Sequence, residues 1–266
     1  MTGHDAIDTT RPHPARVYDW LLGGKDNYPV DEQMAQQLLA LDARAPEMAR
    51  VNRAFMHRAT RWLGMTGGVR QYLDIGTGIP TAPNLHQIAQ EVAPDSRIVY
   101  TDNDPIVLRH AEALLRSTPE GVTEYVQADA REPGAIIEAA GKSLDLSKPV
   151  ALSLIALLHF ISDEDGAHDL VRALLAPLAP GSYLVLSHVT GDFAPETSDR
   201  ARELYKQRGL TLVPRTRDEF AAFFEGLELV GPGVSLATHW RPELGEVIPL
   251  SGDGPIPGYA GVARKP

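Results

Sequence analysis

The most informative stretch of the chain is Tyr72-Leu73-Asp74-Ile75-Gly76-Thr77-Gly78-Ile79-Pro80-Thr81. It begins as an apolar strand, passes through an acidic residue and a Gly-x-Gly turn, and then opens into a helix. Glycines in such a turn allow a ligand to approach the backbone where a Cβ atom would clash. The stretch therefore predicts the first strand, turn and helix of an α/β protein that binds a ligand at the turn.

After residue 70, short apolar segments alternate with amphipathic segments of helix length. The expected strands cover 71–75, 97–101, 123–127, 150–155 and 182–189, and the expected helices cover 81–92, 105–116, 133–140 and 163–178. Strict alternation of this kind predicts a parallel sheet with helices on both faces. Short strand-like segments near 229–236 and 259–264 end the chain.

Two further acidic residues stand at the ends of predicted strands. Asp102 comes 28 positions after Asp74, and Asp129 closes the next strand. Because parallel strands end at one edge of the sheet, these carboxylates should lie near one another. Asp102 could accept both ribose hydroxyls of an adenosine, and Asp129 could accept an adenine amino group beside the backbone N–H of Ala130. The simpler role for Asp102, a cap for the next helix, suits Asp104 better.

Before residue 70 the apolar periodicity is helical, and residues 14–66 are expected to form three helices. A polar, glycine-rich loop, residues 23–28, separates the first two. Its charged tip is either solvated or in contact with a cofactor or substrate. We place a domain boundary at the glycine pair 67–68, so that residues 1–68 form an N-terminal cap and residues 69–266 form the main domain. Arg50, Arg53, His57 and Arg61 share a helix face, which predicts a solvated basic surface or an anionic substrate site.

The composition excludes several classes of protein. The 266 residues contain no cysteine, which rules out disulfides, thiolate zinc sites and a thiol nucleophile. A net charge of −10 opposes binding to nucleic acid. No apolar run approaches the ~20 residues of a membrane span, and no secretory signal is evident, so a cytoplasmic location is expected. The nine histidines show no metal-ligand spacing, and no metal site is predicted.

The series Asp74-x-Gly76-x-Gly78, Asp102 and Asp129 resembles the cofactor site of class I S-adenosylmethionine-dependent methyltransferases. More narrowly, Arg16-Val17-Tyr18-Asp19-Trp20-Leu21-Leu22-Gly23-Gly24-Lys25-Asp26-Asn27-Tyr28, the glycine turn and His239-Trp240-Arg241-Pro242 resemble a bacterial family of S-adenosyl methyltransferases with an unassigned substrate. The resemblance covers the chain from about residue 10 to its end. The N-terminal motif is its specific part, because many nucleotide-binding proteins share the glycine turn.

The resemblance implies a Rossmann-like, seven-stranded, mostly parallel sheet with helices on both faces, an antiparallel last strand and a helical cap over S-adenosylmethionine. The two glycines would face the methionine half of the cofactor, Asp102 the ribose, and Asp129 with Ala130 the adenine. The full set of expected cofactor-binding residues is Asp74, Gly76, Thr77, Gly78, Asp102, Asn103, Asp129, Ala130, Asn27 and Tyr28. One departure is Pro80, which replaces the third glycine of the common turn and removes a backbone donor.

The expected function is methyl transfer from S-adenosylmethionine to a small molecule. A nicotinamide dehydrogenase is a weaker alternative, because its fingerprint requires glycine where Thr81 stands, and Asp74 would repel a pyrophosphate. A non-enzymatic sensor of S-adenosylmethionine or S-adenosylhomocysteine would need the same cofactor residues. His159, which follows the fourth strand, is either a general base or a packed histidine. The acceptor, the catalytic residue and the oligomeric state are open at this point.

Overall fold

The computed structural model describes residues 8–114 and 116–266. Five parallel strands form the centre of its sheet: β1 (Gln71–Ile75), β2 (Arg97–Asp102), β3 (Val122–Gln127), β4 (Ala151–Ile155) and β5 (Tyr183–Val189). The strand β8 (Gly258–Arg264) runs antiparallel to β5, and the two-residue strands β6 (Glu228–Leu229) and β7 (Ser235–Leu236) pair with β8. The order is β3-β2-β1-β4-β5-β8-β6, with β7 beside β8.

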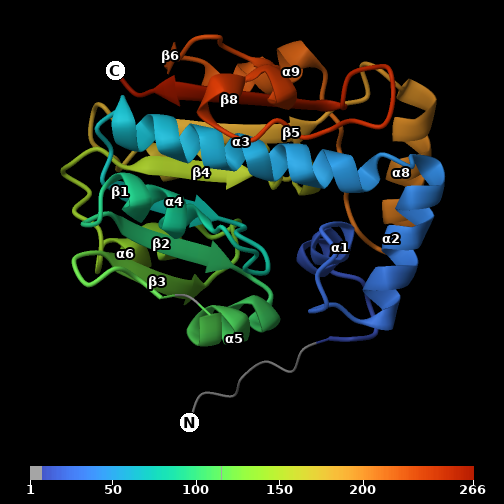
Figure 1. The fold of residues 1–266 in the computed structure, drawn as a ribbon, viewed down its shortest axis with the longest axis horizontal. Coiled ribbons are helices and arrows are strands. Elements are labelled where there is room, and N and C mark those ends of the chain that lie inside the picture. The colour runs from blue at the N-terminus through green and yellow to red at the C-terminus, as the bar shows by residue number, and fades with distance from the viewer. Residues whose placement is uncertain (1–7, 115) are drawn as a thin grey trace.

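This sheet confirms the predicted α/β class and its antiparallel last strand (Figure 1). Eight strands are present where seven were expected, because β6 and β7 both pair with β8. The reversal of strand order at β1 and β4 is the point at which open α/β sheets bind ligands, at the carboxyl ends of the strands. The glycine turn after β1 lies at that point.

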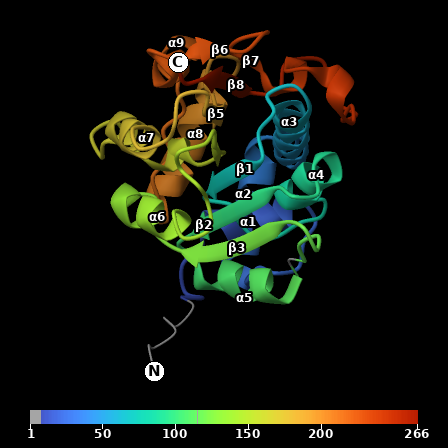
Figure 2. The ribbon, with the colours of Figure 1, turned by 90° about the vertical axis from the view of Figure 1, so that its left-hand side faces the viewer.

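Successive side chains of the central strands pack into two different hydrophobic cores, one on each face of the sheet, because side chains alternate along a pleated strand. Leu73 packs with the helices α6 (Pro133–Ala140) and α7 (Ala167–Leu175), whereas Tyr72 packs on the other face. Figure 2 shows the helices on opposite sides of the sheet. The remaining helices of the main domain are α4 (Leu85–Val92), α5 (Pro105–Leu114), α8 (Pro195–Gln207) and α9 (Arg217–Ala221), with short 3-10 turns at Leu158–Phe160, Ala222–Phe224, Ala237–His239 and Pro242–Leu244.

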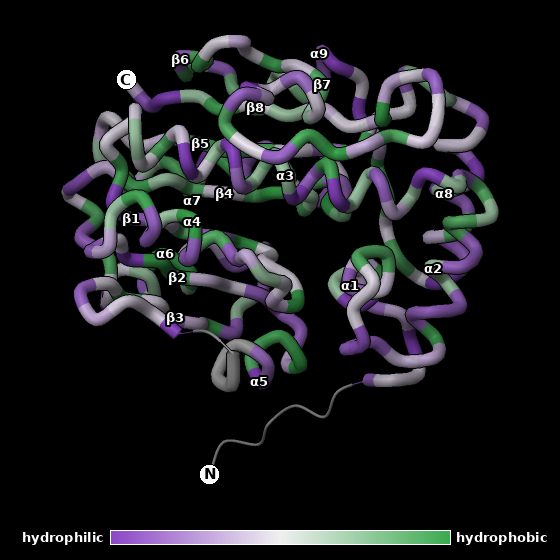
Figure 3. The backbone as a smooth tube through the Cα atoms, in the orientation of Figure 1, coloured by the Kyte–Doolittle hydropathy of each residue, from purple (hydrophilic) through white to green (hydrophobic). Residues whose placement is uncertain are grey.

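The three N-terminal helices have two different positions. The helices α1 (Pro14–Leu21) and α2 (Pro29–Leu41) lie beyond the carboxyl ends of the strands, next to α8 (Figure 1). The long helix α3 (Ala45–Met65) runs along one face of the sheet, where Phe55 and Trp62 pack against Trp240. Hydrophilic residues predominate in α8, whereas α2 carries both hydrophilic and hydrophobic residues (Figure 3). The division into domains at residue 68 stays a prediction.

Candidate functional site

The turn after β1 has the backbone that its glycines predict. Gly76 and Gly78 both have a φ of 69°, in the left-handed region that side chains disfavour. A Cβ atom on Gly76 would lie 2.7 Å from Cδ1 of Leu157. The N–H groups of Gly76 and Thr77 donate to the carbonyl of Thr101 at 2.8 and 3.1 Å, which ties the turn to the neighbouring strand.

Asp74 is buried under this turn. Its carboxylate accepts a hydrogen bond from the Ser153 hydroxyl on β4. Burial raises the pKa of Asp74, while hydrogen bonds from Ser153 and Thr77 act in the opposite direction. A cationic group placed beside this carboxylate would therefore stabilise its ionised form.

Asp102 lies at the end of β2, where its two oxygens accept different backbone donors. Gly78 N–H donates to Oδ2 at 2.9 Å, and Asp104 N–H donates to Oδ1 at 3.0 Å. Since a carboxylate has about four lone-pair sites, each oxygen can accept one more hydrogen bond. Burial raises the pKa of Asp102 above its ordinary value.

Asp129 lies at the end of β3 and is more exposed than the other two acids. Its Oδ1 accepts the backbone N–H of Arg131 at 2.9 Å, and its Oδ2 lies 3.4 Å from Nη1 of the same arginine. The structure therefore brings all three predicted acids to the carboxyl ends of adjacent parallel strands.

A cavity of about 590 Å³ opens at this edge of the sheet. Of the residues proposed from the sequence as cofactor-binding or catalytic, those that line it are Asp74, Gly76, Thr77, Gly78, Asp102, Asn103, Asp129, Ala130 and His159. We call the part lined by the acids and the turns at the ends of β1, β2 and β3 the strand end of the cavity. From there the cavity continues between α1, α2, α3 and α8 to an apolar end, lined by Leu21, Leu38, Met48, Phe160, Leu210 and Leu212.

Asn27 and Tyr28 are not among the cavity-lining residues of the described chain. The Asn27 side chain donates to Asp19 Oδ2 at 2.8 Å, and the backbone N–H of Asp26 donates to the same oxygen at 2.9 Å. The ring of Tyr28 lies under the guanidinium of Arg16, at 5.3 Å. In the structure both residues thus shape the loop between α1 and α2, and their contact with a cofactor stays a prediction.

A buried group of charges ties α1 to the strand end of the cavity. Arg16 Nε lies 3.1 Å from Asp104 Oδ2, and Arg16 Nη1 lies 3.6 Å from Asp31 Oδ2. His13 Nδ1 lies 3.2 Å from the same Asp104 oxygen. Arg16, Asp31 and Asp104 are almost completely shielded from solvent. Because Asp104 follows Asp102 by two residues, this cluster fixes the N-terminal helices directly above the turn after β2.

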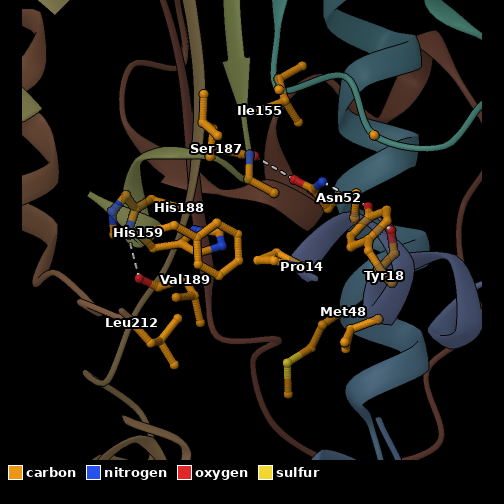
Figure 4. A pocket seen from close by; sticks show the side chains of 18 of the residues that line it. Pro14, Tyr18, Met48, Asn52, Ile155, His159, Ser187, His188, Val189 and Leu212 are labelled. Carbon is orange, nitrogen blue, oxygen red and sulfur yellow. Dashed lines mark hydrogen bonds between the residues drawn. The ribbon is translucent and has the colours of Figure 1, made fainter. Parts of the chain in front are cut away.

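A second polar chain crosses the wall of the cavity (Figure 4). Ala156 N–H donates to Ser187 Oγ at 3.0 Å, and the Ser187 hydroxyl donates to Asn52 Oδ1. Asn52 Nδ2 then donates to the Tyr18 hydroxyl at 2.9 Å, which donates to the carbonyl of Ala49 at 2.9 Å. These bonds join α1, α3 and β5. Sequence reasoning missed Asn52 and Ser187, because nothing in the chain signals that residues 135 positions apart meet.

His159 and His188 stand side by side in the cavity wall (Figure 4), with ring centroids 5.3 Å apart. Arg215 Nη1 donates to His188 Nε2 at 2.7 Å. Because a guanidinium cannot accept, His188 Nε2 is the acceptor, and the proton of this ring lies on Nδ1, 2.7 Å from the Val189 carbonyl. Burial lowers the pKa of His188 to about 3. His188 is thus a neutral ring with both nitrogens occupied.

His159 has no such partners. Its Nδ1 atom is buried without a hydrogen-bond partner among the described residues. The ring lines the cavity, which leaves Nε2 as the nitrogen that a bound molecule could reach. Burial, with smaller contributions from His188 and Arg215, holds the pKa of His159 well below its ordinary value. The ring is therefore neutral at physiological pH and can accept a hydrogen bond.

Three of the four residues of the expected basic face on α3 are half-buried and bind backbone carbonyls, and one of them, Arg53, also lines the cavity. Arg53 Nη2 donates to the Pro83 carbonyl at 2.9 Å, and His57 Nε2 lies 2.8 Å from the same oxygen. Arg61 Nη1 donates to the Leu244 carbonyl at 2.6 Å. These side chains satisfy backbone carbonyls of two loops, whereas Arg50 is exposed.

The described residues hold neither a membrane-spanning helix nor a cluster of metal-binding side chains. Within residues 8–114 and 116–266, no helix has the length and apolar character needed to cross a membrane. No group of three or more histidine, aspartate or glutamate side chains in the same segments has the arrangement of a metal site.

Comparison with known families shows a match of residues 1–266 to the model described as S-adenosyl methyltransferase. Among solved structures, a DUF574 family protein from Streptomyces avermitilis MA-4680 is 47% identical, with a TM-score of 0.93 over 98% of this chain and 100% of that one. A candidate methyltransferase from Thermobifida fusca YX is 36% identical, with a TM-score of 0.88 over 97% and 96% of the two chains.

A more distant structure shares the fold. The S-adenosylmethionine-dependent methyltransferase from Anabaena variabilis ATCC 29413 is 13% identical, with a TM-score of 0.53 over 97% of this chain and 98% of that one. None of the curated proteins matches the chain.

Proposed function

The chain belongs to the S-adenosyl methyltransferase family, and from this premise we propose that its cavity transfers a methyl group from S-adenosylmethionine to a small-molecule acceptor. The observation that carries the proposal is the continuous cavity, which joins the three acids at the strand end to a separate apolar end. A protein that only senses the cofactor has no need of space beyond it. The second compartment therefore supports an enzyme rather than a sensor.

The residues of the strand end fit the cofactor by their chemistry. Asp102 has one acceptor site left on each oxygen, as two ribose hydroxyls require. Gly76 and Gly78 leave the turn open for the methionine half, and Asp74 offers a carboxylate to its ammonium group. We assign the adenine to Asp129 and Ala130, with Asn103 beside them. Thr77 shares the turn with the two glycines.

When bound, S-adenosylmethionine supplies a methyl group on an electron-poor sulfonium. The protein's contribution is to hold the acceptor in line with that group and to exclude water. Ala15, Tyr18 and Leu21 of α1 line the cavity from above, so α1 would shield it. His159 is our candidate for a general base where the acceptor must lose a proton.

The first test is the choice of ligand. We expect titration calorimetry to show that S-adenosylhomocysteine binds more tightly than NAD. The reason is that Asp74 disfavours a pyrophosphate, while Thr81 replaces the third glycine of the dinucleotide fingerprint. Tighter binding of NAD would contradict the assignment of the strand end.

A second test concerns the N-terminal cap. We expect hydrogen exchange at the backbone amides of residues 23–28 to slow when S-adenosylhomocysteine is added, because this loop is bonded to Asp19 of α1, and α1 lines the cavity. The amides of residues 142–148, in a turn away from the cavity, serve as the control. Unchanged exchange at residues 23–28 under saturating ligand would mean that the cap does not respond to the site.

A further inference from the structure

The apolar end of the cavity is built from one hydrophobic cluster. Leu21, Leu38, Phe160, Leu210 and Leu212 are partly buried side chains that pack around Val17, Met34, Ala35 and Tyr205. They come from α1, α2, α8 and the segments after β4 and α8. A pocket of this kind gains binding free energy from apolar surface, at about 25 cal/mol per Å² removed from water.

Few charged side chains line the apolar end among the described residues, and Asp42, at the end of α2, is one of them. The aspartate and arginine side chains that line the cavity are Asp42, Arg53, Asp74, Asp102, Asp129 and Arg131. The last four lie at or just after the ends of β1, β2 and β3, at the strand end. Asp42 binds the Arg44 guanidinium, with Oδ2 3.1 Å from Nη2 and Oδ1 3.2 Å from Nε. Arg53 is engaged by the carbonyls of Thr81 and Pro83.

Polar groups line the cavity where the strand end and the apolar end meet. His159 follows β4, next to Phe160 of the apolar end, with Nε2 as its available nitrogen. The hydrogen-bonded pair of Asn52 and Ser187 lies across from it (Figure 4). His188 cannot take part in the same way, since Arg215 and the Val189 carbonyl occupy both of its nitrogens. His159 therefore offers an unoccupied neutral acceptor at the junction.

We propose, resting on the proposed function, that the acceptor is an uncharged, largely apolar molecule whose hydroxyl group donates a hydrogen bond to His159. Its apolar body would fill the end lined by Phe160 and Leu212. In the reaction, the hydroxyl oxygen forms the new bond to the methyl carbon while the bond from that carbon to sulfur breaks. The electron pair of the broken bond stays on sulfur, and the hydroxyl proton passes to His159.

A weakly basic imidazole suffices for this step. As the new carbon–oxygen bond forms, the hydroxyl approaches a protonated ether, whose proton is far more acidic than that of the free hydroxyl. Proton transfer to a neutral histidine is then favourable even though burial lowers its pKa. A ring that was already protonated at neutral pH could not act in this way.

Charged acceptors fit this cavity poorly. A substrate carboxylate would lie in an apolar pocket whose nearby Arg53 is already bound to backbone carbonyls, and a substrate ammonium would find Asp42 paired with Arg44. An uncompensated charge in such surroundings is costly. The pocket therefore discriminates by rejecting charge as well as by accepting apolar surface.

The test uses three probes of similar shape on the full chain saturated with S-adenosylhomocysteine. These are 2-naphthol, 2-naphthoate and 2-naphthylmethylammonium, and binding is measured by calorimetry at pH 7.5. We expect 2-naphthol to bind at least about tenfold more tightly than either charged probe. Equal or tighter binding of a charged probe, or no binding of 2-naphthol at millimolar concentration, would overturn the proposal. If S-adenosylhomocysteine itself does not bind, the proposed function fails instead.

Three variants examine the two parts of the pocket. In His159→Phe, 2-naphthol should lose its advantage over naphthalene, which has no hydroxyl. In Leu212→Glu, the affinity for 2-naphthylmethylammonium relative to 2-naphthol should rise at least about tenfold. Leu212→Gln, which has the size of glutamate without its charge, should not raise this ratio. All three variants should keep wild-type affinity for S-adenosylhomocysteine, which shows that they are folded. If His159→Phe retained the full preference for 2-naphthol over naphthalene, the hydroxyl would not bind at His159.

Discussion

Arg16→Met is expected to lower the free energy of unfolding by about 3 to 5 kcal/mol, because the substitution removes one partner from a buried group of charges. The guanidinium lies between Asp104 and Asp31, and its side chain is 4% exposed. Methionine fills similar volume but leaves both carboxylates in a site that water hardly reaches. The cost is therefore the desolvation of unpaired charge rather than the loss of packing.

Equilibrium unfolding in urea measures this loss. The matched control is Arg172→Met, which removes an arginine from a surface pair with Asp169, where the side chains are 69% and 81% exposed. Solvent screens that pair, so its loss should cost less than about 1 kcal/mol. Similar losses in the two variants would show that the Arg16 cluster does not hold the N-terminal helices in place.

Local signals account for the parts of the fold that the sequence predicted. The turn at Gly76 and Gly78 needs a backbone that glycine adopts easily, and its position after an apolar strand is visible in a ten-residue window. The positions of Asp102 and Asp129 at the ends of β2 and β3 could be predicted for the same reason, because strands and turns have short-range sequence patterns. Parallel geometry then brings these residues together without further information.

Long-range packing accounts for what the sequence could not show. The periodicity of α3 shows that the helix has an apolar face, but it does not say whether that face covers the carboxyl edge or lies along the sheet. Trp240, far along the chain, packs against Phe55 and Trp62 and helps to hold α3 on the sheet. The two-residue strands β6 and β7 form only because β8 lies beside them.

The acceptor side of the site depends still more on such contacts. His159 and His188 cannot be distinguished in the sequence, because one lies just after a predicted apolar strand and the other lies near the end of the next one. Arg215 separates them in the structure, since it occupies Nε2 of His188 and leaves His159 without a partner on Nδ1. Hydrogen bonding by a third residue thus determines which ring can accept a proton.

Asp102→Ala is expected to weaken the binding of S-adenosylhomocysteine by about 1.5 to 3 kcal/mol, or about 10- to 150-fold. The variant removes the charged acceptors that we assign to the two ribose hydroxyls. It also leaves the N–H groups of Gly78 and Asp104 without their acceptor, which should cost about 1 to 3 kcal/mol of folding stability for each buried group. Binding to this variant is therefore measured by calorimetry at a temperature well below the midpoint of its thermal unfolding.

The pH dependence of binding separates the ligand contact from the structural one. Burial raises the pKa of Asp102, so its carboxylate takes up a proton at a higher pH than a free aspartate would. Protonation removes acceptor capacity, and wild-type affinity should fall as the pH is lowered through that raised pKa. Asp102→Ala should lack this part of the pH dependence. The control is Asp145→Ala, because Asp145 is an exposed acid that binds Ser147 away from the cavity. This variant should keep both the wild-type pH dependence and the wild-type affinity. A wild-type affinity for Asp102→Ala would mean that the ribose binds elsewhere.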